Sequence, residues 1–519
     1  MIKKFIYFSF VFILFFSCKK SVVENEPFVI TDKTITRAEI DNFIKQEIYN
    51  QHQFEWKKAT DEMINSALNY SDHILSVGYT TGKIASFDKS ISSINIHDLE
   101  WQTVRQQIIN LILQSEQQLN KNLTIADIMP WEEKVLPVVD VIVKNPATIK
   151  LLRNNKLVRY AEPLGYEPEE LSIAYQREHI SENASSSGCG SNTATLDLVQ
   201  NMDYVNISPS SKQSWNYIYH NIPRAWSKST GAGTKVFFID TGCEFDQENL
   251  GSAFNQGSST GRTIEKMVTL PRETFLGLPT GDVETPDDGC GHGTAMAGAC
   301  GAPRGTDGNA CGVAYNCNLV TCRAAADVYL DESREAKGVA DAFTNAANRA
   351  DVKIISMSMG RITSSSQIKD AVLYAYGKGK LIFCAAGTSF SWTSGWAGVI
   401  FPASMPEVNA VTGVRDNSSI TTCTDCHSGS ETDFTIVMER FMDYRKPLTL
   451  AMSGDVPSTI GGSSVATATA AGIAALVYSR FPTYTRDQIL NKLIQTSANY
   501  PTRNASLGWG NLNADGATN

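Results

Sequence analysis

Three short segments of this 519-residue chain carry a serine, a histidine and an aspartate that together could drive attack on a carbonyl carbon. In the segment 461–472, GGSSVATATAAG, two glycines lead into a run of small residues, which predicts a tight turn that feeds a buried helix. Ser464 would then lie near the helix N-terminus, where unpaired N–H groups carry partial positive charge and can receive an oxyanion. Taken alone, the segment equally fits a core helix that the serine merely caps.

The other two segments supply the base that a serine hydroxyl needs before it becomes a nucleophile. The run VFFIDTG at 236–242 is typical of a buried strand that ends in an acid, Asp240, and the run GHGTAMAG at 291–298 places His292 at the entry of a second small-residue helix. His292 would accept the proton of Ser464, and Asp240 would hold the imidazole tautomer and stabilise the imidazolium. Each residue alone is commonly a turn or loop residue, but their joint occurrence in these contexts indicates a catalytic triad.

These segments resemble the motifs of the subtilisin-like serine proteases (subtilases), which surround Asp, His and Ser in this chain order, an order known from subtilisin itself. The resemblance runs from about Trp215 to the C-terminus. It implies an exported serine endopeptidase that hydrolyses polypeptide substrates through an acyl-enzyme intermediate. It also implies two segments that bind the peptide main chain as an added strand and leave a primary pocket between them. No Asp or Glu obviously lines that pocket, so a preference for basic residues is not indicated. These are Ser358, Met359 and Gly360, and Ala385, Ala386 and Gly387.

Two departures from the family pattern bear on activity and on metal binding. Thr388 stands where the family usually has the asparagine of the oxyanion hole, so Thr388 becomes the candidate second donor. This change keeps a rival hypothesis open, a catalytically impaired binding or regulatory lipoprotein on the same fold, because fold alone does not separate the two. QENL at 247–250 replaces a segment where the family often has a calcium-ligand aspartate. Calcium is therefore possible but not supported by a motif, and no other metal and no required cofactor are expected.

The elements around these residues alternate between strand-like and helix-like patterns. Buried strands are predicted at 236–240, 318–323, 352–359, 380–385 and 408–414, and helices at 335–349, 367–377 and after Thr485. Such alternation indicates a parallel doubly wound α/β sheet flanked by helices, with ligands beyond the carboxyl ends of the strands. The fold class expected is therefore subtilisin-like, preceded by a helical and α+β pro-region, with the peptidase domain at 201–519.

The N-terminus has the pattern of an export signal. Lys3 and Lys4 precede an apolar run at 5–16, and Cys18 follows it, which resembles a bacterial lipoprotein signal at 1–18 with Cys18 as the lipidated residue. The bulky Phe15 and Phe16 leave an ordinary signal peptide as the alternative. The protein is expected to be exported, either anchored as a periplasmic or surface lipoprotein, with membrane contact only through the lipid, or secreted.

Residues 19–200 are expected to form a pro-region. Helices are predicted after the capping-box pattern at 36–39, at 54–68 and from Asp98, and a strand, helix and strand follow at 138–144, 146–153 and 157–163. The last three elements resemble the C-terminal half of a subtilase propeptide, which implies an intramolecular inhibitor or chaperone that is cut away. The alternative is an accessory domain that stays attached. The serine-rich run at 181–192 is the best linker candidate.

Charge and cysteine content bear on nucleic-acid binding and on disulfide bonds. The net charge of −9 argues against a basic nucleic-acid-binding face. Ten of the eleven cysteines remain when Cys18 is set aside, and an even number in an exported chain suggests disulfides. Cys300 and Cys311 flank a short loop and are the favoured pair, whereas Cys322 and Cys384 could equally be packed thiols. The run CTDCH at 423–427 matches a haem-attachment pattern, but a disulfide explains it better.

Overall fold

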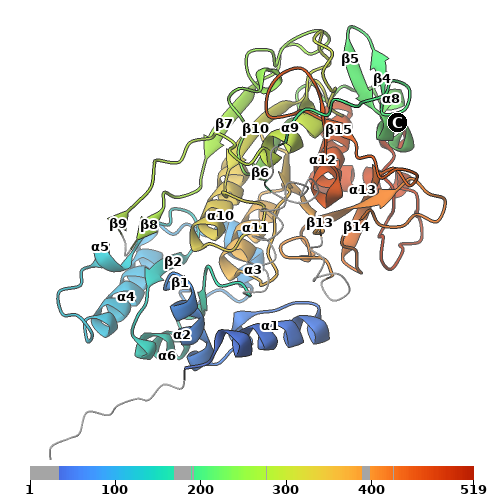
Figure 1. Cartoon of the computed structure of the whole chain (residues 1–519). Coiled ribbons are helices and arrows are strands. Elements are labelled where there is room, and N and C mark those ends of the chain that lie inside the picture. Colours follow the sequence, from blue (N-terminus) through green and yellow to red (C-terminus); the bar gives the residue numbers. More distant parts are fainter. Residues whose placement is uncertain (1–33, 169–188, 190–191, 276–277, 389–397, 425) are drawn as a thin grey trace, which may run out of the picture. The chain divides into compact units, whose positions relative to one another are not determined.

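A seven-stranded sheet, parallel throughout, lies at the centre of the C-terminal part of the chain (Figure 1). In this computed structural model, residues 34–168, 189, 192–275, 278–388, 398–424 and 426–519 are described. The strand order is β14-β13-β12-β11-β6-β10-β7. After β6, the chain adds β7 and β10 on one side of this strand, and it then adds β11 to β14 in order on the other side. The strands are β6 (Lys235–Asp240), β7 (Ile264–Val268), β10 (Asn318–Arg323), β11 (Ile354–Met357), β12 (Leu381–Ala385), β13 (Asn409–Arg415) and β14 (Thr432–Glu439).

Helices cover both faces of this sheet, because each strand is apolar on both sides. In β6, Val236 and Phe238 pack into one core cluster, whereas Phe237 and Ile239 pack into the other. The predicted doubly wound fold is confirmed. The first face is covered by α9 (His292–Gly301), α12 (Gly462–Arg480) and α13 (Arg486–Thr496), and the second by α10 (Ser333–Asn348) and α11 (Ser366–Gly377).

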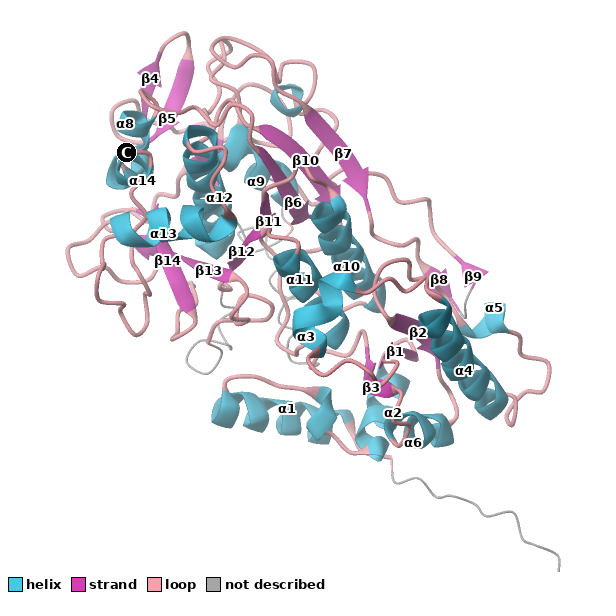
Figure 2. Ribbon diagram, turned by 180° about the vertical axis from the view of Figure 1, so that it is seen from behind, coloured by secondary structure: helices cyan, strands magenta, loops and turns pink. Residues whose placement is uncertain are grey.

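The N-terminal part forms a smaller α+β module with its own core (Figure 2). Its antiparallel sheet has the order β2-β1-β3, and β1 is a strand that the sequence did not reveal. Thr36 forms the predicted capping box, but the helix expected from residue 54 begins at Asp61, because the Thr60 hydroxyl caps it there. The elements are α1 (Arg37–Gln51), α2 (Asp61–Tyr70), β1 (Ile74–Tyr79), α3 (Phe87–Ser90), α4 (Leu99–Glu116), α5 (Ile125–Ile128), β2 (Val138–Ile142), α6 (Pro146–Arg153) and β3 (Val158–Pro163).

Short elements complete the described part of the chain. Only α12 is long and apolar enough to cross a membrane among the described residues, and it is buried inside the fold as a core helix. The short elements are η1 (Trp56–Lys58), η2 (Ile91–Ser93), β4 (Tyr204–Ile207), β5 (Ser211–Ser214), η3 (Trp215–His220), α8 (Ile222–Ala225), η4 (Glu248–Leu250), β8 (Thr274–Phe275), β9 (Leu278–Pro279), β15 (Leu448–Thr449), β16 (Ser458–Thr459) and α14 (Ala514–Ala517).

The sheet of the N-terminal module lies against α10 and α11. Buried polar side chains join the two parts: Ser76 in β1 donates to Gln367 at 3.0 Å, and Gln367 in turn donates to Asp140 of β2 at 3.0 Å. Glu162 in β3 accepts from the hydroxyl of Ser366 at 2.9 Å. Because these groups are buried, separating the two parts would leave unpaired polar atoms unless water replaces each bond.

The disulfides differ from the favoured pairing, and the prediction of a Cys300–Cys311 bond is wrong. Both residues are free buried thiols. The Cys311 thiol donates to the Gly312 carbonyl. Cys300, in the last turn of α9, lies against Cys317. Closeness in sequence did not bring the two sulfur atoms together. Cys322 and Cys384 are packed free thiols, one of the two alternatives. The disulfides found are Cys189–Cys290 and Cys423–Cys426.

Glu162 makes the stability of the chain depend on pH. Burial raises the pKa of Glu162 to about 7, although hydrogen bonds from Ser366 and the charge of Arg361 act in the opposite direction, and Asp370 adds to the rise. Because the unfolded value is about 4.3, the fold prefers the protonated carboxyl. The contribution of Glu162 to the free energy of unfolding should therefore be complete below about pH 4.5. It should decrease as pH rises to about 7. Thermal melts of an inactive Ser464→Ala chain at several pH values would measure this.

The matched control is Glu162→Gln, which keeps the shape and cannot ionise. That variant should show a smaller loss of thermal stability over the same pH range. An equal loss in both chains would mean that Glu162 titrates normally at this junction.

Candidate active site

The end of β6 and the start of α9 bring Asp240 and His292 together. His292 Nδ1 lies 2.7 Å from Asp240 Oδ1, and both side chains are buried. Gly293 makes this approach possible, because the Gly242 backbone lies where a Cβ atom of residue 293 would be. The backbone N–H of Thr241 also donates to Asp240 Oδ1, at 2.9 Å. The carboxylate is therefore fixed in the place where it can hold the Nδ1–H tautomer of His292.

Asp288 is a positioning residue that the sequence reasoning missed. Its carboxylate accepts from the N–H of Gly291 at 2.9 Å and of Thr294 at 2.8 Å, so it caps the N-terminus of α9 around His292. It also accepts from the Thr241 hydroxyl at 2.8 Å, which ties the cap to the strand that carries Asp240. The signal in the sequence that could have identified Asp288 is an aspartate a few residues before a histidine flanked by glycines.

Ser464 lies in the first turn of α12, where the leading N–H groups of a helix have no intrahelical partner. Its hydroxyl donates to the Ser358 carbonyl at 3.4 Å, and the Ser358 hydroxyl donates to the Ser464 carbonyl at 3.0 Å. Met357 pairs with Ile239, so Ser358 continues β11 beside Asp240 at the end of β6. No hydrogen bond joins Ser464 to His292 in the described residues, and such catalytic bonds often tighten only when substrate binds.

Thr388 lies at the rim of the same site, and its hydroxyl is already engaged. Thr388 Oγ1 is 3.0 Å from Ser463 Oγ, and the N–H of Gly387 donates to the same Ser463 oxygen at 3.3 Å. Ser463 directly precedes Ser464, so this contact connects the strand end after β12 with the N-terminus of α12. The arrangement keeps Thr388 close to the helix N–H groups that could stabilise an oxyanion.

The two segments predicted to bind a peptide main chain both border one small cavity beside Ser464. The backbone edge at Gly360 is occupied by the chain itself: the Gly360 N–H donates to the Val328 carbonyl at 3.2 Å, and the Leu330 N–H donates to the Gly360 carbonyl at 3.0 Å. An added strand needs free N–H and C=O groups. A peptide would therefore have to displace residues 328–330 before it could bind along Gly360.

Glu167 of the N-terminal module binds residues on both sides of the pairing between Gly360 and residues 328–330. Its buried carboxylate accepts from Tyr329 Oη at 2.5 Å and from Arg361 Nε at 2.8 Å, and Thr363 also donates to it. Arg361 further donates to the carbonyls of Leu164 at 2.9 Å and Tyr166 at 3.1 Å. The residues on both sides of the Gly360 pairing are thus tied to the last described residues of the module.

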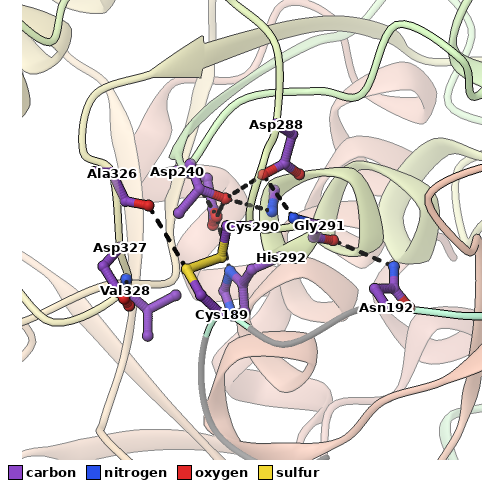
Figure 3. The surroundings of a disulfide bond; sticks show 12 residues. Cys189, Asn192, Asp240, Asp288, Cys290, Gly291, His292, Ala326, Asp327 and Val328 are labelled. Atoms are coloured by element: carbon purple, nitrogen blue, oxygen red, sulfur yellow. Dashed lines mark hydrogen bonds and ion pairs between the residues drawn. A yellow bond between two sulfur atoms is a disulfide. The ribbon is translucent and has the colours of Figure 1, made fainter. Parts of the chain in front are cut away.

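A disulfide links the chain after the N-terminal module to the loop that carries His292 (Figure 3). Cys290 is two residues before His292, and Cys189 lies within the predicted linker 181–192, most of which is outside the described residues, as is Cys18. The Cys189 sulfur also lies 3.6 Å from the Ala326 carbonyl oxygen. Asn192 then donates to the carbonyls of Gly291 at 3.2 Å and Leu450 at 2.8 Å. The end of the predicted linker is therefore fastened next to the candidate base.

The electrostatics favour a histidine that accepts a proton. Burial by itself lowers the pKa of His292, but the charge and hydrogen bond of Asp240 outweigh burial, with a smaller contribution from Asp288. The net result is a pKa raised above the ordinary value of about 6.5. A more basic imidazole is a better acceptor for the serine proton.

The described residues contain no group of three or more His, Cys, Asp or Glu side chains that could hold a metal ion. Gln247, in the segment 247–250 that replaces the one where the family often has a calcium-ligand aspartate, donates its amide to the Ala451 carbonyl at 2.7 Å and accepts from the Asn249 N–H at 3.0 Å. Its side chain is thereby used in the fold itself.

Comparison with known proteins finds similarity to one protease family. The model of the subtilase family matches residues 231–510. The chain is 27% identical to thermitase of Thermoactinomyces vulgaris over 263 residues, which cover 50% of this chain and 79% of thermitase. It is 29% identical to subtilisin DY of Bacillus licheniformis over 277 residues, which cover 52% of this chain and 85% of that protein. The crystal structure of MycP1 from Mycobacterium smegmatis is similar over 64% of this chain and 90% of its own, with 20% identity and a TM-score of 0.46.

Proposed function

Because the protein belongs to the subtilase family and is thereby a serine-type hydrolase, we propose that it cleaves internal peptide bonds with Asp240, His292 and Ser464 as its triad. The observation that carries the proposal is the 2.7 Å bond between His292 Nδ1 and Asp240 Oδ1, at the same sheet edge as Ser464. Three motifs far apart in sequence supply these groups, and the family match spans all three.

In the proposed mechanism, Ser464 Oγ turns from the Ser358 carbonyl toward His292 Nε2 and attacks the scissile carbonyl carbon. His292 takes the hydroxyl proton and then delivers it to the leaving amine, while Asp240 stabilises the imidazolium. The Ser464 N–H at the start of α12 stabilises the oxyanion, with Thr388 as the second donor. A water molecule, activated by the same histidine, then hydrolyses the acyl-enzyme and restores Ser464.

The test is labelling of the purified protein by a fluorophosphonate, which reacts with activated serine nucleophiles. Labelling should be lost in Ser464→Ala, and it should persist in the presence of EDTA, since we propose that no metal or other cofactor is required. The second candidate, a catalytically impaired binding protein, is favoured by Thr388 in place of an amide side chain. Absence of labelling in a folded protein from which the pro-region has been cut away would establish that candidate instead.

We also propose that residues 19–200 act as an intramolecular inhibitor that is removed on maturation. The contacts of Glu167 with Tyr329 and Arg361 support this role, because they hold residues 328–330 against Gly360. Cutting the chain after Glu167 would free these segments to exchange their mutual pairing for a substrate strand.

The proposed export and lipid anchor at Cys18 would be tested by incorporation of labelled fatty acid, which Cys18→Ser should abolish.

Maturation should be visible at the N-terminus of the protein. Purified active protein is expected to begin between Gly165 and Trp215, and Ser464→Ala protein should keep its pro-region if the cut is autocatalytic. Sequencing of both N-termini measures this. The Cys189–Cys290 disulfide adds a diagnostic: a cut after Cys189 would leave the pro-region attached on a non-reducing gel and release it on reduction.

A cut before Cys189 would instead release the pro-region on both kinds of gel. Fully active protein with an uncut N-terminus would show that the module is an accessory domain.

A further inference from the structure

We propose that Ile400 closes the primary pocket, so that the enzyme cleaves after small uncharged residues such as alanine or serine and not after large ones. The proposal rests on the peptidase function proposed above and names its substrate class. The relevant position is the substrate residue whose carbonyl Ser464 attacks, because its side chain must enter the space between the two main-chain-binding segments.

With residues 328–330 paired to Gly360, that space is a cavity of about 50 Å³ next to Ser464. An apolar cavity that binds benzene measures about 150 Å³. Pockets for larger ligands measure roughly 300–1,000 Å³. A methyl or hydroxymethyl side chain fits the cavity, whereas an aromatic ring does not. The lining residues are Val328, Tyr329, Ser358, Met359, Gly360, Ile362, Ala385, Gly387, Thr388, Ile400, His427, Ser463 and Ser464.

Ile400 fills the gap between the two segments. A Cβ atom added to Gly360 would lie 2.5 Å from Ile400 Cδ1, and one added to Gly387 would lie 3.2 Å from Ile400 Cγ1. The Ile400 side chain therefore contacts a glycine of each segment at once. Its backbone cannot easily withdraw, because the Ile400 N–H donates to the Ala386 carbonyl at 3.0 Å.

Ile400 also lines a second space, a cavity of about 270 Å³ that residues of the N-terminal module such as His52 and Phe54 close on the far side. Ile362 is the other isoleucine that borders both spaces. The Ile400 side chain is thus a partition between a small pocket at Ser464 and a larger space beyond it. Shortening this one side chain would join the two.

His427 forms a second wall and keeps the pocket uncharged. Its N–H donates to the Gly387 carbonyl at 2.9 Å, and its Nδ1 lies 3.0 Å from the Gly398 carbonyl oxygen. The Cys423–Cys426 disulfide directly precedes it and fixes the start of this segment. Burial lowers the pKa of His427 to about 4, so the ring is neutral when the enzyme works. Among the described residues, the lining includes no Asp, Glu, Lys or Arg, so a charged side chain would find no partner on those walls.

The experiment compares peptide p-nitroanilides that differ only in the residue at the cleavage site: alanine, serine, leucine or phenylalanine. Rates are expressed per active site, counted by fluorophosphonate labelling, so that partial misfolding of a variant does not enter. Wild type should cleave after alanine or serine with a kcat/KM about 10- to 200-fold higher than after phenylalanine, the range that pocket size alone can supply. Ile400→Ala should raise kcat/KM for phenylalanine by a similar factor and change the alanine value little.

Two further variants keep the proposal falsifiable if Ile400→Ala folds poorly. Ile400→Leu conserves volume and should retain the preference for small residues, whereas Ile400→Val removes only Cδ1 and should improve cleavage after leucine. A labelled wild-type enzyme that prefers phenylalanine, or an Ile400→Ala ratio equal to that of wild type, would overturn the role of Ile400 while leaving the peptidase function intact. A folded protein that neither labels nor cleaves any substrate would overturn both.

Discussion

Replacing Ser464 with alanine is expected to remove nearly all peptidase activity, a loss of about 10⁶ in kcat, the size known for subtilisin itself. The reason is chemical: alanine has no oxygen to attack the carbonyl, and water must act directly on the substrate. His292→Ala should cost about as much, because an unactivated hydroxyl is a poor nucleophile at neutral pH. The measurement is kcat on a peptide substrate, with thermal melts to show that each variant is folded.

The double variant sharpens this test. Residues that act as one unit are not additive, so Ser464→Ala with His292→Ala should be little worse than either single change. Asp240→Asn keeps the shape of the side chain and should cost less, about 10⁴ in kcat, because it disturbs the tautomer of His292. Substantial activity in either single alanine variant would place the nucleophile or the base elsewhere in the chain.

Replacing Thr388 with asparagine is expected to raise kcat by as much as 10²–10³, about the amount that one oxyanion donor contributes in subtilisin. An amide side chain reaches farther than a threonine hydroxyl, and that hydroxyl is 3.0 Å from Ser463 Oγ instead of being free. KM should change little, because the gained interaction exists only in the transition state. Steady-state kinetics on one peptide substrate measures both constants. We therefore expect the native protein to be a slow enzyme.

Thr388→Val is the matched control, since it keeps the shape and deletes the hydroxyl. It should lower kcat if the hydroxyl donates to the oxyanion, directly or through a water molecule. If Thr388→Asn and Thr388→Val both match wild type, the second donor is a different group.

Much of the catalytic framework follows from local sequence, because local forces decide it. The strand 318–323 was predicted with the bounds that β10 has, and the capping patterns at Thr36 and Thr485 mark the starts of α1 and α13. Runs that are apolar at every position indicate strands buried on both faces, which only a sheet between two helix layers provides. The place of Ser464 at a helix N-terminus was visible in the same way, from two glycines followed by small residues.

Other features could not be predicted, because they depend on which distant residues meet. The pairing of Cys189 with Cys290 joins residues 101 positions apart, whereas the nearby Cys300 and Cys311 remain thiols. The cap that Asp288 provides for α9 depends on the approach of strand and helix across Gly293. A hydrogen bond or disulfide of this kind leaves no periodic signal in the chain.

The sequence by itself determined the fold class, much of the alternation of strands and helices in the peptidase part and the three residues proposed for catalysis, because hydrophobic periodicity, helix caps and reactive side chains are all local properties. Tertiary structure decided what surrounds those residues. It pairs Gly360 with residues 328–330, binds Glu167 to the residues on both sides of that pairing, and places the Ile400 side chain between Gly360 and Gly387. These outcomes are set by the packing of side chains from separate elements in a dense core, where a difference of one methyl group determines whether a pocket is open or closed.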